Sequence, residues 1–215
     1  MNWALDHVFL ACSDVEGAKR AVSDFGIVLD EGRIHRGQGT ANVCAYFENA
    51  FFELLYSVDD DELGSEAVRP LGLKERIEWQ TTGACPFGVC FRPVADAELP
   101  PVKCWAYAPA YVPVGSSIPI VTPRGSTHEP LVFISPRRHP NAQGVTIAHR
   151  GEKRTLTRVR VQHPEKWQPS AGVRWFAENG PLSLTSGARF QLELIWGNGA
   201  TGHSEIANLP LCVSW

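Results

Sequence analysis

The sequence lacks any long run of hydrophobic residues and any pair of cysteines with a motif spacing. No apolar run approaches the roughly 20 residues of a membrane-spanning helix, and a strand pattern begins near Ala4, which leaves no room for a signal peptide. The six cysteines are scattered, and Cys85 and Cys90 do not have the spacing of a zinc or redox motif. We therefore expect a cytoplasmic protein with buried thiols, away from membranes.

Several catalytic motifs are also missing. The chain has no serine in a G-x-S-x-G turn, no P-loop and no H-E-x-x-H, which argues against covalent hydrolases, NTPases and helical zinc peptidases. The glycines of residues 36–42 do not form a dinucleotide fingerprint, because Asn42 takes the place of the third glycine. They predict a close approach of backbones instead.

The charge is small and unevenly spread. A net charge of −3 argues against nucleic acid as the main partner. Residues 1–66 carry thirteen Asp and Glu against four Lys and Arg, whereas residues 137–166 carry eight Lys and Arg against two Glu. This asymmetry would hold the two halves together, attract an anion, or reflect two solvated faces.

What is present is a strand, a helix and three strands within residues 3–58. Residues 3–12 alternate as a strand, with Leu5, His7 and Phe9 on one face. A helix then runs from a capping box at Ser13 to a stop at Gly26. Strand patterns follow at 27–31, 40–47 and 51–58. The order is βαβββ.

A weaker copy of this unit appears near the C-terminus. We predict a first βαβββ module at residues 1–60 and a connecting segment at 61–148, which is β-rich from 75 onward and reads as an insertion. A second, degenerate module and tail follow at 149–215, with a short helix interrupted by Pro169. The predicted fold class is α+β, with paired βαβββ modules that form a curved mixed sheet around a cavity.

Two carboxylates interrupt apolar strands. Glu53 lies in Phe51–Tyr56, and Glu193 lies in a similar run at 190–196. A buried charge is costly unless it is paired, hydrogen-bonded or bound to a metal. The first strands of the two predicted modules offer His7 and Arg158 as their partners.

These residues resemble the glyoxalase-like branch of the vicinal oxygen chelate superfamily. The resemblance rests on the run from Leu5 to Leu10, the Phe25-Gly26 helix end, residues 35–42, and Phe51 to Leu55, and it is weaker over 149–197. It implies that the first and last strands of each module hold a divalent metal such as Zn, Mn, Fe or Ni. Carried over by position, the metal ligands are His7, Glu53 and Glu193.

The fourth ligand position departs from the family pattern. It is occupied by Arg158, whose guanidinium has no lone pair for a metal. Arg158 and Arg160 lie two residues apart on one strand face and predict binding of a carboxylate or phosphate. The alternative is that both form structural ion pairs with acidic residues such as Glu193.

Two further polar residues are placed at the cavity rim. His35 and Asn42 are predicted to bind substrate there, and His139, in a basic run, is predicted to lie at the edge of the pocket.

The resemblance implies a small-molecule enzyme in which His7 and Glu53 are catalytic. The reaction would be that of a lyase, isomerase or dioxygenase on a small acidic or oxygen-rich substrate. The alternative is a metal-free protein of the same fold that binds a ligand. We expect no nucleic acid or membrane partner, and a homodimer is left open.

Overall fold

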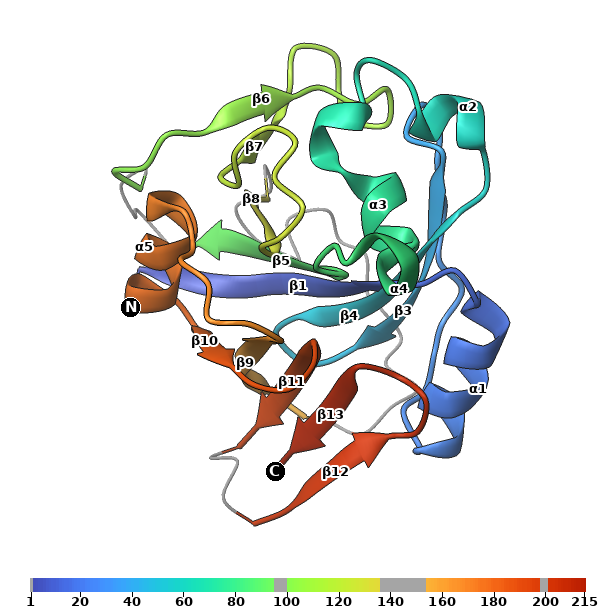
Figure 1. The fold of residues 1–215 in the computed structure, drawn as a ribbon, viewed down its shortest axis with the longest axis vertical. Helices are drawn as coiled ribbons and strands as arrows, with labels where there is room; N and C mark the ends of the chain where they lie inside the picture. The colour runs from blue at the N-terminus through green and yellow to red at the C-terminus, as the bar shows by residue number, and fades with distance from the viewer. Residues whose placement is uncertain (1, 95–99, 136–153, 198–200) are drawn as a thin grey trace.

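Strands predominate in the computed structural model, which describes residues 2–94, 100–135, 154–197 and 201–215 (Figure 1). The strands are β1 (Trp3–Ala11), β2 (Ile34–His35), β3 (Thr40–Tyr46), β4 (Phe51–Ser57), β5 (Phe87–Pro93), β6 (Trp105–Tyr107), β7 (Ile118–Ile120), β8 (Leu131–Ile134), β9 (Leu156–His163), β10 (Leu182–Ser186), β11 (Gln191–Trp196), β12 (His203–Ile206) and β13 (Leu211–Ser214). The helices are α1 (Val15–Asp24), α2 (Asp60–Leu63), the 3₁₀ helix η1 (Arg69–Leu71), α3 (Leu73–Ile77), α4 (Trp79–Thr82) and α5 (Ala171–Asn179).

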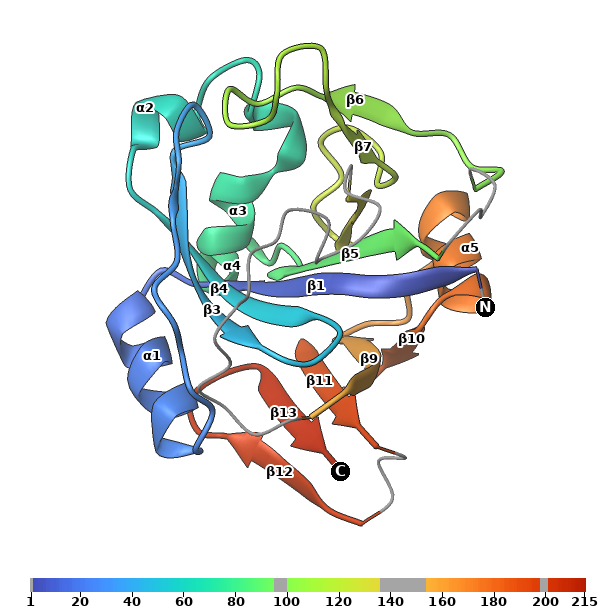
Figure 2. The ribbon, with the colours of Figure 1, turned by 180° about the vertical axis from the view of Figure 1, so that it is seen from behind.

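The first eight strands form one sheet with a repeated order. Its order is β2-β3-β4-β1-β5-β8-β7-β6, so β1 and β5 are antiparallel neighbours at the centre. On one side β1 pairs in parallel with β4, and on the other β5 pairs in parallel with β8. Figure 1 and its reverse view, Figure 2, show β1 and β5 side by side across the middle of the molecule. The predicted α+β class with a curved mixed sheet is confirmed.

The last five strands form a second sheet of order β10-β9-β11-β13-β12. One hydrophobic core joins the two sheets, since Val8, Leu10 and Phe52 share it with Val159 and Leu192. The smaller sheet therefore covers one face of the larger one. Because side chains alternate along a strand, the residues between these core positions on β9 and β11 point away from the large sheet.

The position of the second module is a correction to the sequence analysis. We placed it at 149–215, with an insertion at 75–148. The strand order instead places the partner of the first module at β5–β8, inside the supposed insertion. No helix occupies the described residues 94 and 100–104, where consecutive prolines, Pro100 and Pro101, disfavour one. Without that helix, the repeat could not be read from the sequence.

The C-terminal region contains a strand, a helix and strands, but it pairs differently. In the first module, the strand after the helix lies at the sheet edge, and β4 takes the place beside β1. In the C-terminal region, β10 pairs directly with β9 in parallel and β11 lies antiparallel on the other side of β9. Among the described residues, this region forms a separate sheet, and none of its strands pairs with a strand of the first module.

The first module matches its prediction except at the start of α1, at residues 27–31 and in the faces of β1. The cap of α1 is Asp14, not Ser13, and its side chain accepts a hydrogen bond from the backbone N–H of Gly17 at 2.9 Å. Residues 27–31 contribute a single bridge between Asp30 and Cys44, and the strand that follows is the short β2.

A β-bulge corrects the predicted faces of β1. The register with β5 shifts between Leu5 and His7, so Asp6 is an extra residue in the ladder. Leu5 consequently joins Val8 in the core between the sheets, whereas Phe9 packs on the other face of the large sheet. His7 alternates with Val8 and shares the face of Phe9. The bulge thus allows Leu5 to face the core, while His7 lies on the opposite face.

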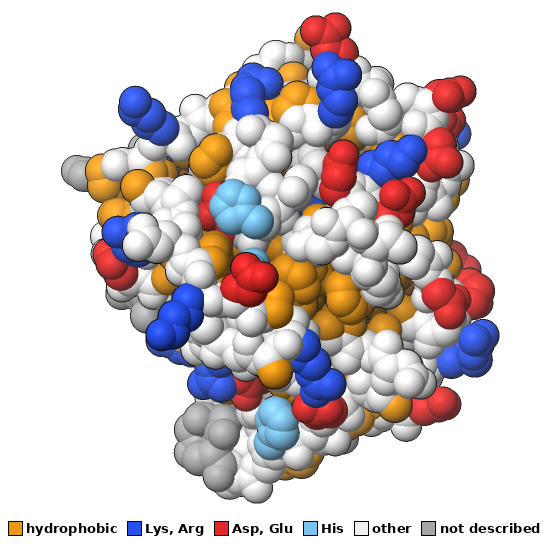
Figure 3. Space-filling model, in the orientation of Figure 1, with side chains coloured by type: hydrophobic (Ala, Val, Ile, Leu, Met, Phe, Trp, Pro, Cys, Tyr) orange, Lys and Arg blue, Asp and Glu red, His pale blue; other side chains and the backbone are white. Residues whose placement is uncertain are grey.

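The surface offers no simple electrostatic clue. On the face drawn in Figure 3, acidic and basic side chains are interspersed rather than gathered by sign. In the described part of the chain, no helix has the length and apolar character needed to cross a membrane.

Candidate active site on the face of the large sheet opposite the core

His7 and Glu53 converge on this face of the large sheet. They lie on the adjacent parallel strands β1 and β4, where Phe9 is the direct neighbour of Glu53. His7 Nε2 is 3.8 Å from Glu53 Oε1, and both side chains are largely buried. This distance exceeds a hydrogen bond, so the two groups face each other across a small gap. The predicted convergence of these residues is confirmed.

Asp6 fixes the other side of the imidazole. His7 Nδ1 is 2.6 Å from Asp6 Oδ1. Burial opposes the charge on His7, but the hydrogen bond to Asp6 and the charge of Glu53 raise its pKa above the ordinary value. Burial would likewise raise the pKa of Asp6, yet the bond from His7 and the charges of His7 and Arg92 lower it. An ionised Asp6 holds the hydrogen on Nδ1 and leaves Nε2 facing Glu53.

Asn42 holds the second oxygen of Glu53. Its Nδ2 donates to Glu53 Oε2 at 3.0 Å, and its own Oδ1 accepts from the backbone N–H of Arg33 at 2.8 Å. Asn42 is therefore a buried support for the carboxylate rather than a free rim residue. It leaves Oε1 as the oxygen that faces His7.

Aromatic rings enclose this polar row. The His7 ring stacks on Phe51, with centroids 4.4 Å apart, and meets the edge of Phe133 at 5.3 Å. Phe133 comes from β8, so both halves of the sheet contribute to the site. Apolar walls strengthen the electrostatic interactions among the groups between them.

A second polar chain runs beside the first. His35 Nδ1 lies 3.0 Å from Thr40 Oγ1, which accepts from Gln38 Nε2 at 2.7 Å. Gln38 Oε1 in turn accepts from the hydroxyls of Tyr107 and Tyr111 at 3.1 and 2.8 Å. Burial lowers the pKa of His35 to about 4, so its imidazole is neutral at physiological pH.

Arg33 adds a positive charge to this side of the site. Its guanidinium lies 5.6 Å from the centre of the Tyr111 ring, and the His35 ring lies 5.3 Å from the same ring. The charge of Arg33 opposes the rise in the pKa of His7 and adds to the lowering of the pKa of His35 by burial. Among the described residues, no carboxylate forms an ion pair with Arg33.

The glycines of residues 36–42 allow the predicted close approach of backbones. Gly39 has φ +75°, and a side chain there would meet the carbonyl of Asp59 at 2.2 Å. The Glu62 carboxylate accepts the backbone N–H groups of Gly37 and Gly39 at 2.7 and 3.0 Å. This turn fixes the strand that carries Thr40 and Asn42.

The symmetry of the sheet identifies the counterparts of His7 and Glu53. His7 pairs with Cys90 across β1 and β5. Glu53 comes two residues after the β4 partner of His7, and Ser135 comes two residues after the β8 partner of Cys90. Ser135 hydrogen-bonds to Asp6, and burial raises the pKa of Cys90 well above its ordinary value. The second half thus supplies a protonated thiol and a hydroxyl.

The structure does not bring Glu193, Arg158 and Arg160 to this site. They lie on β9 and β11, on the face of the smaller sheet that points away from the large one. Arg160 pairs with Glu193, and Ser214 Oγ donates to the other oxygen of that carboxylate. Arg158 instead donates to Ser183 at 3.1 Å. This corrects the prediction that His7, Glu53 and Glu193 form one ligand set, and that both arginines line the same cavity.

A smaller group of metal-ligand atoms does occur at the site. Among the described residues, one group of at least three His, Cys, Asp or Glu side chains has its ligand atoms within 4.8 Å of one another: Asp6, His7 and Cys90. Glu53 lies beside it, with Oε1 facing His7 Nε2. A histidine whose Nδ1 is bound by a carboxylate is a common arrangement at metal centres.

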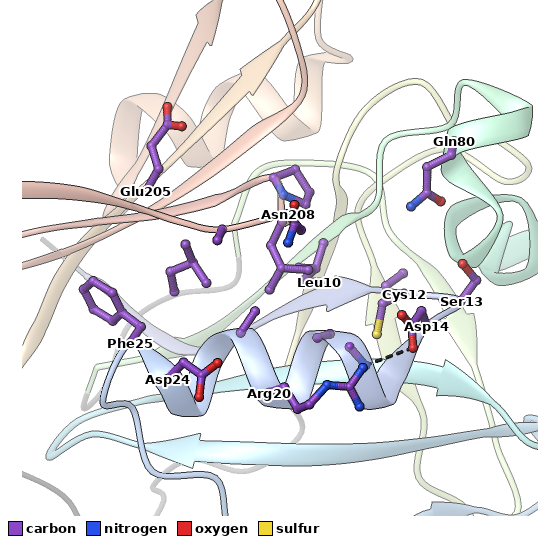
Figure 4. Close-up of a pocket in the computed structure, with 18 of the residues that line it drawn as sticks. Leu10, Cys12, Ser13, Asp14, Arg20, Asp24, Phe25, Gln80, Glu205 and Asn208 are labelled. Atoms are coloured by element: carbon purple, nitrogen blue, oxygen red, sulfur yellow. Dashed lines mark hydrogen bonds between the residues drawn. The ribbon is translucent and has the colours of Figure 1, made fainter.

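A separate cavity lies behind β1. It has a volume of about 720 Å³ and is bounded by α1, the start of α4 and the turn between β12 and β13. Figure 4 shows Asp14, Arg20 and Asp24 of the α1 region opposite Asn208 of that turn. Neither His7 nor Glu53 lines it. The acid–base groups are therefore found on the other face of the sheet.

Sequence reasoning missed several residues of the site, among them Asp6, Arg33 and Gln38. Asp6 was masked by the alternation of β1, which the bulge interrupts. Arg33 precedes His35 by two residues, a spacing that places both on one strand face and was a usable signal. Gln38 gave no signal, because its partners Tyr107 and Tyr111 are distant in sequence. His139 lies outside the described residues.

The buried neutral His35 leads to a prediction for acid stability. Between pH 6.5 and 4 the unfolded chain takes up a proton at His35 that the folded protein does not. The free energy of unfolding should therefore fall with falling pH, by about 3 kcal/mol at pH 4. The measurement is urea unfolding of the wild type and of His35→Gln between pH 4 and 7. The variant should lose about 3 kcal/mol less than the wild type between pH 7 and pH 4, because it lacks this imidazole.

The charges that face His35 do not change the sign of this prediction. The charge of Glu53 opposes the lowering of the His35 pKa, whereas the charges of Arg33 and His7 reinforce it. The raised pKa of His7 acts in another window, because its stabilisation is present below pH 6.5 and is lost as the pH rises through its folded pKa. If the free energy of unfolding changed with pH in the same way for the wild type and His35→Gln, the folded protein would take up the His35 proton as readily as the unfolded chain. His35 would then be protonated in the folded protein at low pH.

Comparison with known proteins supports the assignment of the fold. The model of the glyoxalase-like domain family matches residues 5–99. A hypothetical protein from Staphylococcus aureus is similar over 99% of this chain and 98% of its own, with 12% identity and a TM-score of 0.60. At that identity, the likeness concerns the fold alone.

Other similar structures cover less of the chain. A methylmalonyl-CoA epimerase of Streptomyces coelicolor with bound 2-nitronate-propionyl-CoA covers 62% of this chain and 94% of its own, with 18% identity and a TM-score of 0.42. A methylmalonyl-CoA epimerase with methylmalonyl-CoA and NH4+ covers 65% and 99%, with 16% identity and a TM-score of 0.41. No curated protein matches this chain.

Proposed function

We propose that this chain, which carries a glyoxalase-like domain of the vicinal oxygen chelate superfamily at residues 5–99, is an enzyme that transfers a proton within a small acidic substrate. The observation that carries the proposal is the row Asp6–His7–Glu53–Asn42 on one face of the sheet. In this row an imidazole lies between two carboxylates, and each outer group is oriented by a hydrogen bond. Such positioned acid–base pairs are the usual agents of proton transfer.

Each residue has a distinct role in this proposal. Glu53 Oε1 takes the proton from a carbon next to a carbonyl, while Asn42 holds Oε2. His7 Nε2 returns a proton to the substrate, and Asp6 keeps the other ring hydrogen on Nδ1. Arg33 binds the acidic group of the substrate, the task that sequence analysis gave to Arg158 and Arg160.

The same residues would suit a divalent metal. His7 Nε2 and Glu53 Oε1 face each other across 3.8 Å, and both atoms are typical ligands of Zn, Mn, Fe or Ni. Asp6, bound to Nδ1, would orient the imidazole, and Cys90 offers a further ligand atom near Asp6 and His7. A bound metal would supply Lewis-acid polarisation of a substrate oxygen. Lyase and dioxygenase activities remain predictions of the family resemblance.

A metal-free binding protein is the second candidate. The observation that favours it is the pair Cys90 and Ser135, which occupy the counterpart positions of His7 and Glu53 and, as a protonated thiol and a hydroxyl, offer a metal no charged ligand. Elemental analysis of protein purified without added metal separates the two candidates. A ligand whose affinity is unchanged by a chelator, together with no exchange activity, would favour the binding protein.

The proposed function is tested by hydrogen exchange in D2O. A panel of small carboxylic acids with a C–H next to a carbonyl is incubated with the protein, with and without added metal, and followed by proton NMR. We expect at least one acid to lose that hydrogen signal. Arg33→Gln should raise the acid concentration needed by about tenfold or more, because a charge-assisted hydrogen bond is lost.

Arg36→Gln is the matched control, because Arg36 is exposed in the same segment. It should leave the concentration dependence unchanged. The proposal is wrong if no acid exchanges under either condition, and the role of Arg33 is wrong if both variants behave alike.

A further inference from the structure

We infer that His35 is a neutral hydrogen-bond donor whose Nε2–H binds a carbonyl oxygen of the substrate, next to the carboxylate bound by Arg33. This inference rests on the proposed function and names its substrate class: small acids with a carbonyl next to the carboxylate. It gives His35 a role separate from proton transfer.

The first step is the orientation of Gln38. Its Oε1 accepts from both tyrosine hydroxyls, Tyr107 and Tyr111, and its Nε2 donates to Thr40 Oγ1. Burial raises the pKa of both tyrosines, so they remain protonated and can donate. The amide is thereby fixed with its nitrogen toward Thr40.

The second step is the position of the hydrogen on His35. Thr40 is fully buried and accepts from Gln38, and its own hydroxyl hydrogen has His35 Nδ1 as its neighbour at 3.0 Å. No other hydrogen-bond acceptor for that hydroxyl occurs among the described residues. Thr40 therefore donates to Nδ1, and the single hydrogen of the neutral imidazole is on Nε2.

The third step is the free side of His35. The residue is 5% exposed, and its Nε2 has no hydrogen-bond partner among the described residues. Nε2 is not one of the buried side-chain atoms that lack a partner, so this edge of the ring is accessible and can donate to a small molecule. Tyr111 has His35 at 5.3 Å and the Arg33 guanidinium at 5.6 Å, so a donor and a cation share one aromatic ring.

These positions suit a small planar acid. A carboxylate at Arg33 would leave an adjacent carbonyl oxygen to accept from His35 Nε2–H. The planar carboxylate–carbonyl unit would then lie near the ring of Tyr111. An acid without the carbonyl would leave His35 unpaired, which is the basis for discrimination.

The tautomer is tested by NMR of the ring nitrogens of His35. We expect the wild type to carry its hydrogen on Nε2. Gln38→Glu should move it to Nδ1, because a carboxylate accepts the Thr40 hydroxyl and turns it away from His35. Tyr107→Phe is the control, since Tyr111 still donates to Gln38, and it should leave the tautomer unchanged.

Substrate discrimination is tested with pyruvate and propionate, which differ by the carbonyl. Titrations followed by the His35 signals should show pyruvate binding about tenfold tighter to the wild type, as expected for one hydrogen bond. The preference should be lost in Gln38→Glu. In His35→Phe, followed by the Tyr111 signals, it should also be lost.

Three results would overturn the inference. They are an Nδ1–H tautomer in the wild type, a pyruvate preference that persists in both variants, and the absence of binding at His35. If Gln38→Glu does not fold, the wild-type tautomer and His35→Phe still decide the matter. Pyruvate binding with the expected preference, together with no exchange of any acid of the panel in D2O, would refute the proposed function and leave this inference intact.

Discussion

Glu53→Gln is expected to slow exchange of the substrate hydrogen by about 100- to 10 000-fold, the range typical of a lost general base. The amide has the size of the carboxylate and can still accept the hydrogen bond from Asn42. It cannot take a proton at neutral pH, and it is a poor metal ligand. The measurement is the exchange rate in D2O, with the metal content determined on the same preparation.

Glu193→Gln is the matched control, because Glu193 is also a strand carboxylate within an apolar run. The structure pairs it with Arg160 and Ser214, on the far side of the smaller sheet. Its exchange rate should equal that of the wild type. If the exchange rate fell equally in both variants, Glu193 would have to be part of the active site. If the exchange rate of Glu53→Gln did not fall, Glu53 would not be the catalytic base.

The first module was predictable because its signals are local. The capped helix, the tight turn before β4 and the alternation of β3 and β4 can each be read within a few residues. The convergence of His7 and Glu53 then followed from the pairing of the first and last strands. Even here, the bulge at Asp6 reversed the predicted face of Leu5, since one extra residue reverses the alternation.

The second half was not predictable by the same means. Its strands β6 and β7 have only three residues each, and no helix separates β5 from β6 in the described residues. The strand, helix and strand from β9 to β10 gave a stronger local pattern than β5–β8. The repeat was therefore predicted at the C-terminus. The actual symmetry depends on β5 pairing with β1, a contact between residues that are about eighty positions apart in the sequence, from Leu10 with Phe87 to Trp3 with Pro93.

The polar network was only partly predictable for a related reason. His35 and Asn42 were identified as site residues, but Asn42 supports Glu53 from within and His35 belongs to another chain of hydrogen bonds. Tyr107 and Tyr111, which orient that chain, come from the other half of the sheet. Distant contacts of this kind leave no periodic signal.

Arg76 has a structural role that the sequence did not reveal. It lies on α3, is fully buried, and donates to the backbone carbonyls of Leu71, Cys85, Ser126 and Glu129. Burial lowers its pKa, although the neighbouring Cys85, Glu129 and Glu75 oppose this effect. The guanidinium thereby joins α3 to the segments that precede β5 and β8.

Arg76→Met is expected to lower the free energy of unfolding by about 4 kcal/mol or more. Met fills much of the same space, but it leaves these buried carbonyls without donors, at roughly 1 to 3 kcal/mol each where water cannot reach them. Urea unfolding at neutral pH measures the loss. Arg69→Met is the control, because Arg69 lies in the adjacent η1 helix, is exposed, and makes no side-chain hydrogen bond to a described residue.

The two arginine variants separate loss of charge from loss of the buried hydrogen bonds. Both remove one positive charge from neighbouring positions, so a general effect of charge would appear in both. Only Arg76→Met should be strongly destabilised. A loss below about 1 kcal/mol would mean that water reaches the freed carbonyls, since solvated carbonyls carry little cost. The buried guanidinium would then fill space between α3 and the strands without joining them.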